Sequence, residues 1–185
     1  MLCVLWLGAS AAFGQGTILF DNRPPQVNAP VTLANGQGPG PSMVAGIFLV
    51  QNNSLDLVAT TPFRTGSDPR VLGYFVPVNV TVPGVPINGP ATFRVRVWSV
   101  TASSYEDAVL SGICHGEFNT VSGGPNLFVP RLGDPDLPGG QPLDTVFLEG
   151  LAPLQLDCIP EPGTLAILLF GAFLLCSHPW KRLPG

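Results

Sequence analysis

The chain of 185 residues carries eight Lys and Arg against twelve Asp and Glu, so its formal net charge is −4. This acidic balance argues against a nucleic-acid-binding protein, because such proteins need a basic face. The length suits one domain with short segments at either end.

The first residues form a predicted signal peptide, residues 1–14. An apolar run extends to Ala12, and Phe13 and Gly14 complete a small-large-small pattern that fits a signal-peptidase site before Gln15. No basic residue precedes the run, so we expect the true start codon to lie upstream. An uncleaved N-terminal anchor is the alternative.

Residues 15–158 are expected to form one domain of 144 residues. They hold six Arg, no Lys and eleven Asp and Glu, which gives a formal charge of −5. Gly and Pro number 17 each, close to the range of low-complexity chains. The apolar residues are nevertheless clustered into runs, which indicates short strands between many turns rather than disorder.

The runs predict ten strands in chain order. They cover residues 17–20, 27–33, 43–51, 55–59, 74–82, 91–100, 118–121, 127–129, 145–148 and 151–156. Asn52, Asn53 and Ser54 predict a turn that makes a hairpin of the third and fourth strands. Gly46 weakens the third strand somewhat, and Pro77 limits the fifth to an edge or a bulge.

Residues 91–100 give the clearest strand pattern. Phe93, Val95 and Val97 are expected on one face. The other face is expected to carry Thr92, Arg94, Arg96 and Trp98. Strict alternation with arginines outward predicts one face in water and therefore an antiparallel sheet.

The domain contains one helical pattern, over residues 103–110. Ser103 and Glu106 are spaced as a capping box, and Gly112 suits the C-terminal end of the helix. Many short strands with turns at this spacing predict an all-β fold, an antiparallel β-sandwich of jelly-roll or Ig-like type.

The C-terminal segment, residues 159–185, differs from the domain before it. Its apolar run begins at Thr164, ends at Ser177 and contains no charge, which predicts a hydrophobic helix outside the domain. The run spans about 21 Å, less than a bilayer core of about 30 Å. That length alone favours a buried core helix or a transient insertion signal. Trp180 beside Lys181 and Arg182 favours the membrane.

Pro160, Glu161 and Pro162, followed by this helix and the basic end, resemble the PEP-CTERM sorting signal of Gram-negative bacteria. The resemblance implies recognition by exosortase, a membrane-embedded cysteine protease-like transpeptidase, with cleavage near the motif and delivery to the cell surface. Such bacteria often make exopolysaccharide. Family tails usually end in several arginines, whereas this one has Lys181-Arg182 followed by Leu-Pro-Gly.

The domain itself is similar to small PEP-CTERM proteins of Verrucomicrobia and Planctomycetes. The similarity lies in Phe-Arg-Val-Arg-Val-Trp, at residues 93–98, followed by Ser-Ser-Tyr-Glu-Asp-Ala-Val at residues 103–109. It supports an exported location and implies no activity.

Cys114, His115 and Cys158 are the only thiol and imidazole groups of the domain. As metal ligands they lack the paired spacing of a zinc site. As a nucleophile and a base, adjacent residues seldom bring their side chains together. In an oxidising compartment the two cysteines can form a disulfide. A disulfide, two free thiols, and a catalytic or metal role remain as alternatives.

Two acidic groups are weaker candidates. Asp134-Pro135-Asp136 supplies too few carboxylates for calcium, and a solvated turn explains it better. A glycosidase pair among Glu106, Asp107 and Glu117 needs a separation that sequence cannot give. We therefore expect no catalytic residue, metal or cofactor.

These observations predict a secreted, non-enzymatic surface or matrix protein. Its expected partners are exosortase, the inner membrane transiently, and exopolysaccharide, and nucleic acid is not expected. The alternative is a carbohydrate-binding module that stacks sugars on Trp98 and on Tyr74 or Tyr105; a hydrolase is the least favoured. Trp98 is also interpretable as a core residue of a second packed face, and for Trp98 this interpretation is slightly favoured.

Overall fold

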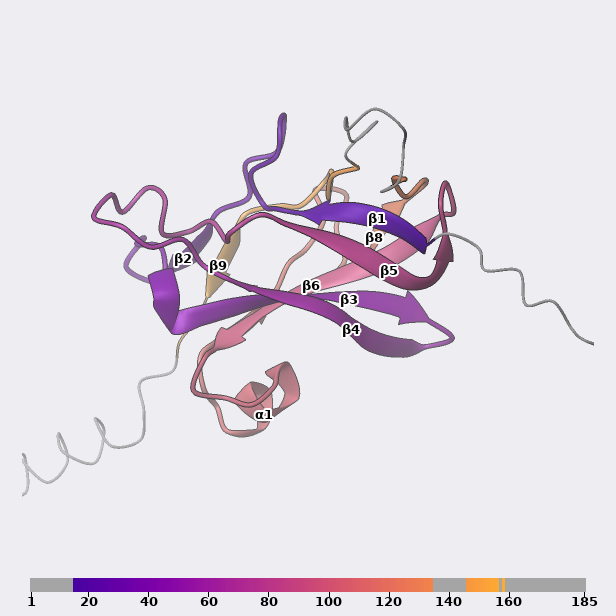
Figure 1. Ribbon diagram of the computed structural model, residues 1–185. Coiled ribbons are helices and arrows are strands. Elements are labelled where there is room, and N and C mark those ends of the chain that lie inside the picture. The colour runs from indigo at the N-terminus through magenta and orange to yellow at the C-terminus, as the bar shows by residue number, and fades with distance from the viewer. Residues whose placement is uncertain (1–14, 135–145, 157, 159–185) are drawn as a thin grey trace, which may run out of the picture.

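Five strands form the largest sheet of the computed structural model, which describes residues 15–134, 146–156 and 158 (Figure 1). The fold is mostly β with one short α-helix, as predicted. The elements are β1 (Gln15–Phe20), β2 (Val31–Leu33), a 3-10 turn (Gly40–Ser42), β3 (Met43–Gln51), β4 (Ser54–Pro62), β5 (Val78–Pro86), β6 (Ala91–Ser99), α1 (Tyr105–Leu110), β7 (His115–Glu117), β8 (Leu127–Val129) and β9 (Leu154–Leu156).

The predicted hairpin is confirmed as β3 and β4. The two strands pair antiparallel from Gln51↔Ser54 outward, around a two-residue turn. Asn52 and Asn53 both have positive φ, 47° and 65°. A tight hairpin turn of this kind requires positive φ at both positions, and asparagine tolerates it better than most residues.

A second antiparallel pair, β1 with β5, lies over one face of the five-stranded sheet (Figure 1). The apolar side chains of both layers form one core. From the pair, the core contains Ile18, Phe20, Val80 and Val82, and from β3 and β6 it contains Ala45, Ile47, Leu49, Phe93, Val95 and Val97. The inward face predicted for β6 is therefore confirmed.

Strand β5 begins at Val78 and not at residue 74 as predicted. Pro77, which lacks an N–H, precedes it. The residues before Pro77 pair elsewhere: Arg64 N–H donates to the Tyr74 carbonyl at 2.8 Å, and Val76 N–H to the Pro62 carbonyl at 2.9 Å. Phe75 is fully buried there.

Strands β2 and β9 pair in parallel, with Val31 opposite Leu154. The expectation of a wholly antiparallel fold is therefore wrong for this pair. It joins segments from the two ends of the domain, and nothing in either local pattern specifies the partner. The five-stranded sheet itself is antiparallel throughout.

Strands β7 and β8 share one edge of β6, β7 along Arg96 to Trp98 and β8 along Ala91 to Phe93. The prediction for β8 is confirmed. The strand predicted at residues 118–121 is wrong, because a turn occupies part of it: Thr120 N–H donates to the Gly124 carbonyl at 2.9 Å. The strand that pairs with β6 is β7, at residues 115–117, just before the predicted one.

Residues 146–148 form no named strand, and only the bridge Leu19↔Phe147 marks the strand predicted there. Within the described residues, no helix has the length and apolar character needed to cross a membrane. The signal peptide, residues 1–14, and the C-terminal segment, residues 159–185, lie outside the described residues. Pro160, Glu161, Pro162, the Thr164 to Ser177 run, Lys181 and Arg182 lie there too.

Helix α1 covers part of the face of the sheet opposite β1 and β5 (Figure 1). A second apolar cluster forms beneath it, from Phe48, Trp98, Ala102 and Ala108. A Cβ at Gly46 would lie 2.6 Å from two atoms of the Trp98 ring. Glycine at this position therefore leaves room for the Trp98 indole ring. The face of the sheet that was predicted to be solvent-exposed is partly packed.

The N-cap of α1 is Ser104 and not Ser103, a correction of one residue. The Ser104 hydroxyl accepts a hydrogen bond from Asp107 N–H at 3.0 Å, and the Asp107 carboxylate in turn accepts one from Ser103 N–H at 2.8 Å. Gly112 ends the helix with φ of 66°, as predicted. Ile113 N–H then donates to the Ala108 carbonyl at 2.9 Å, which completes a Schellman motif.

Candidate functional site

A disulfide joins Cys114 to Cys158, with 4.4 Å between the Cα atoms. Cys114 directly precedes β7, and Cys158 follows β9 closely, so the bond ties these two strands together. Gly116 permits their close approach, because a Cβ there would lie 2.4 Å from a Leu156 methyl group. Bonded sulfurs are neither nucleophiles nor metal ligands, so the free-thiol, catalytic and metal alternatives do not apply to this state.

His115 has a structural role. Its Nδ1 lies 2.6 Å from the Ile113 carbonyl oxygen, and its ring meets the Tyr105 ring edge to face at 5.6 Å between centroids. Across residues 15–134, 146–156 and 158, no three His, Cys, Asp or Glu side chains gather as a metal site requires. The imidazole packs α1 against β7.

Arg96 is the centre of a polar cluster between β6, β7 and α1. Its guanidinium pairs with Glu106 at 2.9 Å and with Glu117, and it lies over the rings of Tyr105 and Phe48 at 4.4 and 5.2 Å. Two of the three carboxylates considered for a glycosidase pair, Glu106 and Glu117, therefore bind the same arginine. The third, Asp107, accepts hydrogen bonds from Ser103. The arrangement holds α1 to the sheet.

Tyr105 is held neutral within this cluster. Burial of the hydroxyl raises the pKa of Tyr105 above its ordinary value of 10.0, and the Glu117 carboxylate raises it further, while Arg96 acts in the opposite direction. A tyrosine with a raised pKa does not serve as a base near neutral pH. Its part is to pack beneath Arg96.

The aromatic residues predicted as sugar platforms are largely covered. Trp98 is 5% exposed beneath α1, and Tyr74 is 7% exposed. Arg23 lies over the Tyr74 ring at 4.9 Å, and Arg96 lies over Tyr105. Stacking needs an open ring face, so the structure corrects the assignment of Trp98 and Tyr74 and leaves Tyr105 covered on one side. For Trp98 the core interpretation holds.

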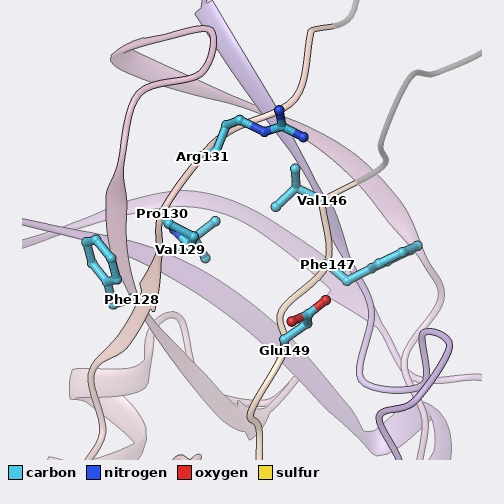
Figure 2. A pocket seen from close by; sticks show the side chains of 7 residues that line it. All are labelled: Phe128, Val129, Pro130, Arg131, Val146, Phe147 and Glu149. Atoms are coloured by element: carbon cyan, nitrogen blue, oxygen red, sulfur yellow. The ribbon is translucent and has the colours of Figure 1, made fainter.

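An open pocket of about 570 Å³ lies beside β8 (Figure 2). Its wall is formed by Phe128, Val129, Pro130, Arg131, Val146, Phe147 and Glu149. Leu127 and Val129 point into the core, so the alternation of the strand turns Phe128 outward, where it is 64% exposed. In the view of Figure 2, the Glu149 carboxylate lies between the two phenylalanine rings.

The backbone of the 146–149 segment is fixed by neighbours. Leu19 N–H donates to the Val146 carbonyl at 2.9 Å, and Glu149 N–H donates to the Phe147 carbonyl at 2.9 Å. The pocket thus combines an exposed aromatic ring with one basic and one acidic side chain, and ligand pockets in general join apolar walls to a few polar groups.

Comparisons with protein-family models, curated proteins and solved structures find no match for this chain. Sequence reasoning missed Phe128, Arg131 and Glu149. The three-residue run at 127–129 predicts a strand but does not say which face is buried, so the outward position of Phe128 had no signal of its own.

Proposed function

We propose that this is an exported, non-enzymatic surface or matrix protein whose C-terminal segment is a sorting signal for exosortase. The observation that carries the proposal is the disulfide between Cys114 and Cys158. Disulfides persist in oxidising compartments and are rare in the cytosol. A bonded pair supports export, in agreement with the signal peptide predicted at residues 1–14.

The position of the bond also supports the boundary of the sorting segment. Cys158 packs against the main core and is the last cysteine before Pro160, Glu161 and Pro162. The folded domain is therefore closed covalently two residues before the motif. A processing enzyme acting at the motif would cut outside the loop that the bond closes, and the domain would survive cleavage.

The non-enzymatic role is supported by how the candidate side chains are used. Glu106 and Glu117 bind Arg96, and Asp107 anchors the start of α1. These carboxylates are therefore engaged by structural partners.

The architecture we propose for the domain is an antiparallel β-sandwich of jelly-roll or Ig-like type. The layer of β1 and β5 faces the five-stranded sheet across a shared apolar core, and this arrangement supports it. A sandwich of this kind presents loops at both ends and needs no helix from the C-terminal segment for its core.

Two changes to the C-terminal segment test the sorting role. Deleting residues 159–185 should give a soluble domain of unchanged stability that fails to reach the cell surface. Glu161→Ala should leave the full-length form unprocessed in the membrane fraction, whereas Glu149→Ala, the control in the domain, should be processed normally. Fractionation with an antibody to the domain, and a thermal melt of the truncated protein, give the readouts.

Two results would contradict the sorting role. If the truncated chain is unfolded or aggregated, the apolar run from Thr164 to Ser177 belongs to the core of the domain. If Glu161→Ala is processed as the unaltered chain is, Pro160-Glu161-Pro162 is not a recognition motif. Either result removes the sorting proposal.

A second candidate function is carbohydrate binding, favoured by the exposed ring of Phe128 beside Arg131 and Glu149. Sugar rings stack on exposed aromatic faces, and charged side chains bind their hydroxyl groups. Phe128→Ala should abolish binding on a glycan array and leave the melting temperature unchanged. Val121→Ala, which removes another exposed apolar side chain, is the matched control. Equal binding by both variants would remove this candidate.

A further inference from the structure

A second hollow, of about 710 Å³, lies where the loop after β1 meets the loop before β5. Its wall is formed by Arg23, Pro24, Pro25, Val27, Asn28, Arg70 and Tyr74. Two of the six domain arginines thus line one concave surface, and no carboxylate lines it. This is unexpected on a domain whose formal charge is −5.

The two walls of the hollow are held together by Asn22, which is fully buried. Its amide nitrogen donates to the Ala29 carbonyl at 2.8 Å and to the Gly73 carbonyl at 3.1 Å, and its amide oxygen accepts from Phe75 N–H at 3.1 Å. All three hydrogen bonds join the 22–29 loop to itself or to the 73–75 segment. The hollow is therefore formed by fixed backbone.

One rim is a tight turn. Val27 N–H donates to the Pro24 carbonyl at 3.1 Å, and Gln26 has φ of 73°. Proline before a residue with positive φ is the arrangement of a type II turn, and Pro25 fixes the first of these two positions. Arg23 and Asn28 flank this turn, and both contact Tyr74.

The charges at the hollow are not neutralised by ion pairs. Among the described residues, Arg94 and Arg96 pair with Glu117, whereas neither Arg23 nor Arg70 has a carboxylate within ion-pair distance. Arg23 stacks on Tyr74 at 4.9 Å, which orients its guanidinium and leaves the N–H groups at its edge uncovered by that ring. Arg70 is exposed.

The remaining polar group at the hollow is also a donor. The Tyr74 hydroxyl donates to Asn28 Oδ1, so the Asn28 amide keeps its N–H groups for another acceptor. Two guanidinium groups and one amide therefore present N–H donors to a ligand. The chemistry that matches several convergent N–H donors is an oxyanion.

We propose that this hollow binds the carboxylate groups of an acidic, uronate-containing polysaccharide. The remainder of a domain with a charge of −5 repels every polyanion, and it repels most strongly the densely spaced phosphates of an anionic membrane or a nucleic acid. A polysaccharide chain can place one carboxylate in the hollow while its neutral hydroxyl groups contact the surrounding surface. The proposal adds a ligand class to the surface role and depends neither on the C-terminal segment nor on the Phe128 pocket.

The test measures binding of the full-length chain in detergent to polygalacturonate, with neutral dextran as the second ligand. Arg23→Gln and Arg70→Gln should each weaken polygalacturonate binding by about tenfold, because each removes a charge-assisted hydrogen bond. Arg94→Gln, which removes a cation of β6 that lines neither the hollow nor the Phe128 pocket, is the matched control and should bind as the unaltered chain does. Raising the salt to about 0.5 M should weaken binding further.

Asp68 provides a variant that should act in the opposite direction. Its carboxylate accepts a hydrogen bond from Arg70 N–H at 2.9 Å and is exposed beside the hollow. Asp68→Asn keeps this acceptor and removes the negative charge, so it should strengthen polygalacturonate binding. A gain in Asp68→Asn together with losses in the two arginine variants assigns the effect to charge at the hollow and not to folding.

Three outcomes would overturn the proposal: equal binding of dextran and polygalacturonate, unchanged binding in Arg23→Gln and Arg70→Gln, or tighter binding to vesicles containing phosphatidylglycerol than to polygalacturonate. Binding of inorganic phosphate without binding of the polymer would also overturn it, because the site would then take only small oxyanions. Thermal melts of each variant exclude loss of fold as the cause.

Discussion

The side-chain oxygen of Asn22 accepts a hydrogen bond from the backbone N–H of Phe75 at 3.1 Å, across 53 positions of the sequence. Phe75 in turn packs against Phe20, with 4.6 Å between ring centroids. One buried amide thus fixes a loop at the end of β1 to the segment that leads into β5. The core and the Arg23–Arg70 hollow both depend on this connection.

Replacing this amide should be costly. Asn22→Ala removes three hydrogen bonds, to the Ala29 and Gly73 carbonyls and from Phe75 N–H; of these groups, the Gly73 carbonyl keeps a second donor, Val31 N–H at 2.9 Å. At about 1 kcal/mol for each bond, we expect a loss of about 3 kcal/mol in the free energy of unfolding. Asn35→Ala is the control, because Asn35 is exposed and makes one local hydrogen bond to Gln37. Urea titrations of both variants give the comparison. Similar midpoints would contradict the role assigned to Asn22.

Two aromatic residues should differ sharply when truncated. Trp98 is 5% exposed, so Trp98→Ala should lower the free energy of unfolding by about 3–5 kcal/mol. Phe128 is 64% exposed, so Phe128→Ala should leave the melting temperature nearly unchanged. Thermal melts measure both. An unchanged melting temperature in Trp98→Ala would show that the cluster under α1 adds nothing to stability.

Gly46, which lies against the Trp98 indole ring, should not tolerate a larger side chain. Gly46→Ala places a methyl group 2.6 Å from the Trp98 ring, and the overpacking should cost about 1–3 kcal/mol of unfolding free energy. Combining it with Trp98→Leu should cost less than the sum of the two single changes, since the smaller side chain leaves room for the methyl group. Simple additivity in this double-mutant cycle would place the cause elsewhere, in the strand backbone.

At acidic pH, the stability of the domain should depend on the protonation of Asp107. The hydrogen bonds from Ser103 N–H and from the Ser103 hydroxyl lower the pKa of Asp107 below its ordinary value of 3.8. A lowered pKa in the folded state gives a stabilisation that is complete above 3.8 and is lost as the pH falls through the folded value. The stability gap between the unaltered chain and Asp107→Asn should therefore narrow as the pH falls below 3.8.

The control for this experiment is Asp56→Asn, on the exposed part of β4. Its side chain makes only long contacts, 3.4 Å, with the Ser54 hydroxyl. Melts between neutral pH and about pH 2 give the comparison over the range in which an ordinary Asp titrates. A gap for Asp107→Asn that stays constant across this range would mean that charge plays no part at the start of α1.

The disulfide should be detectable as missing thiols. In a full-length chain carrying Cys3→Ser and Cys176→Ser, Cys114 and Cys158 are the only cysteines left. The unfolded, unreduced protein should show no labelled thiol, and reduction should expose two. The bond closes a loop with a sequence separation of 44, so its loss should cost up to about 4 kcal/mol by loop entropy. Two thiols before reduction would refute the bond.

Strands with local signals were predictable. Turn residues bracket the apolar runs of β3 and β8, so the bounds of these strands follow from the sequence, and Asn52-Asn53 specifies the hairpin. The start of β5 was misplaced because Tyr74 and Phe75 continue the apolar pattern across Pro77. The backbone there pairs with the end of β4 and the residues after it: Arg64 N–H donates to the Tyr74 carbonyl, and Val76 N–H donates to the Pro62 carbonyl.

The features that the sequence did not reveal depend on long-range contacts. The parallel pairing of β2 with β9 and the three hydrogen bonds of Asn22 join segments far apart in the chain. Trp98 was expected on a face with two arginines, and whether that face is wet depends on where α1 packs. The pocket at Phe128 needed the same kind of information, because a three-residue strand gives too little periodicity to assign its faces.

The bond between Cys114 and Cys158 determines how the domain would carry mechanical load. Tension applied to the chain beyond Cys158 passes through the sulfur atoms to Cys114 and from there to α1 and β6. The segment between the two cysteines, with β7, β8 and β9, lies inside the closed loop and bears none of it. The short pairing of β9 with β2 therefore cannot be peeled away from this end. Strand β6, paired with β3 from Phe93 to Ser99, takes the pull instead.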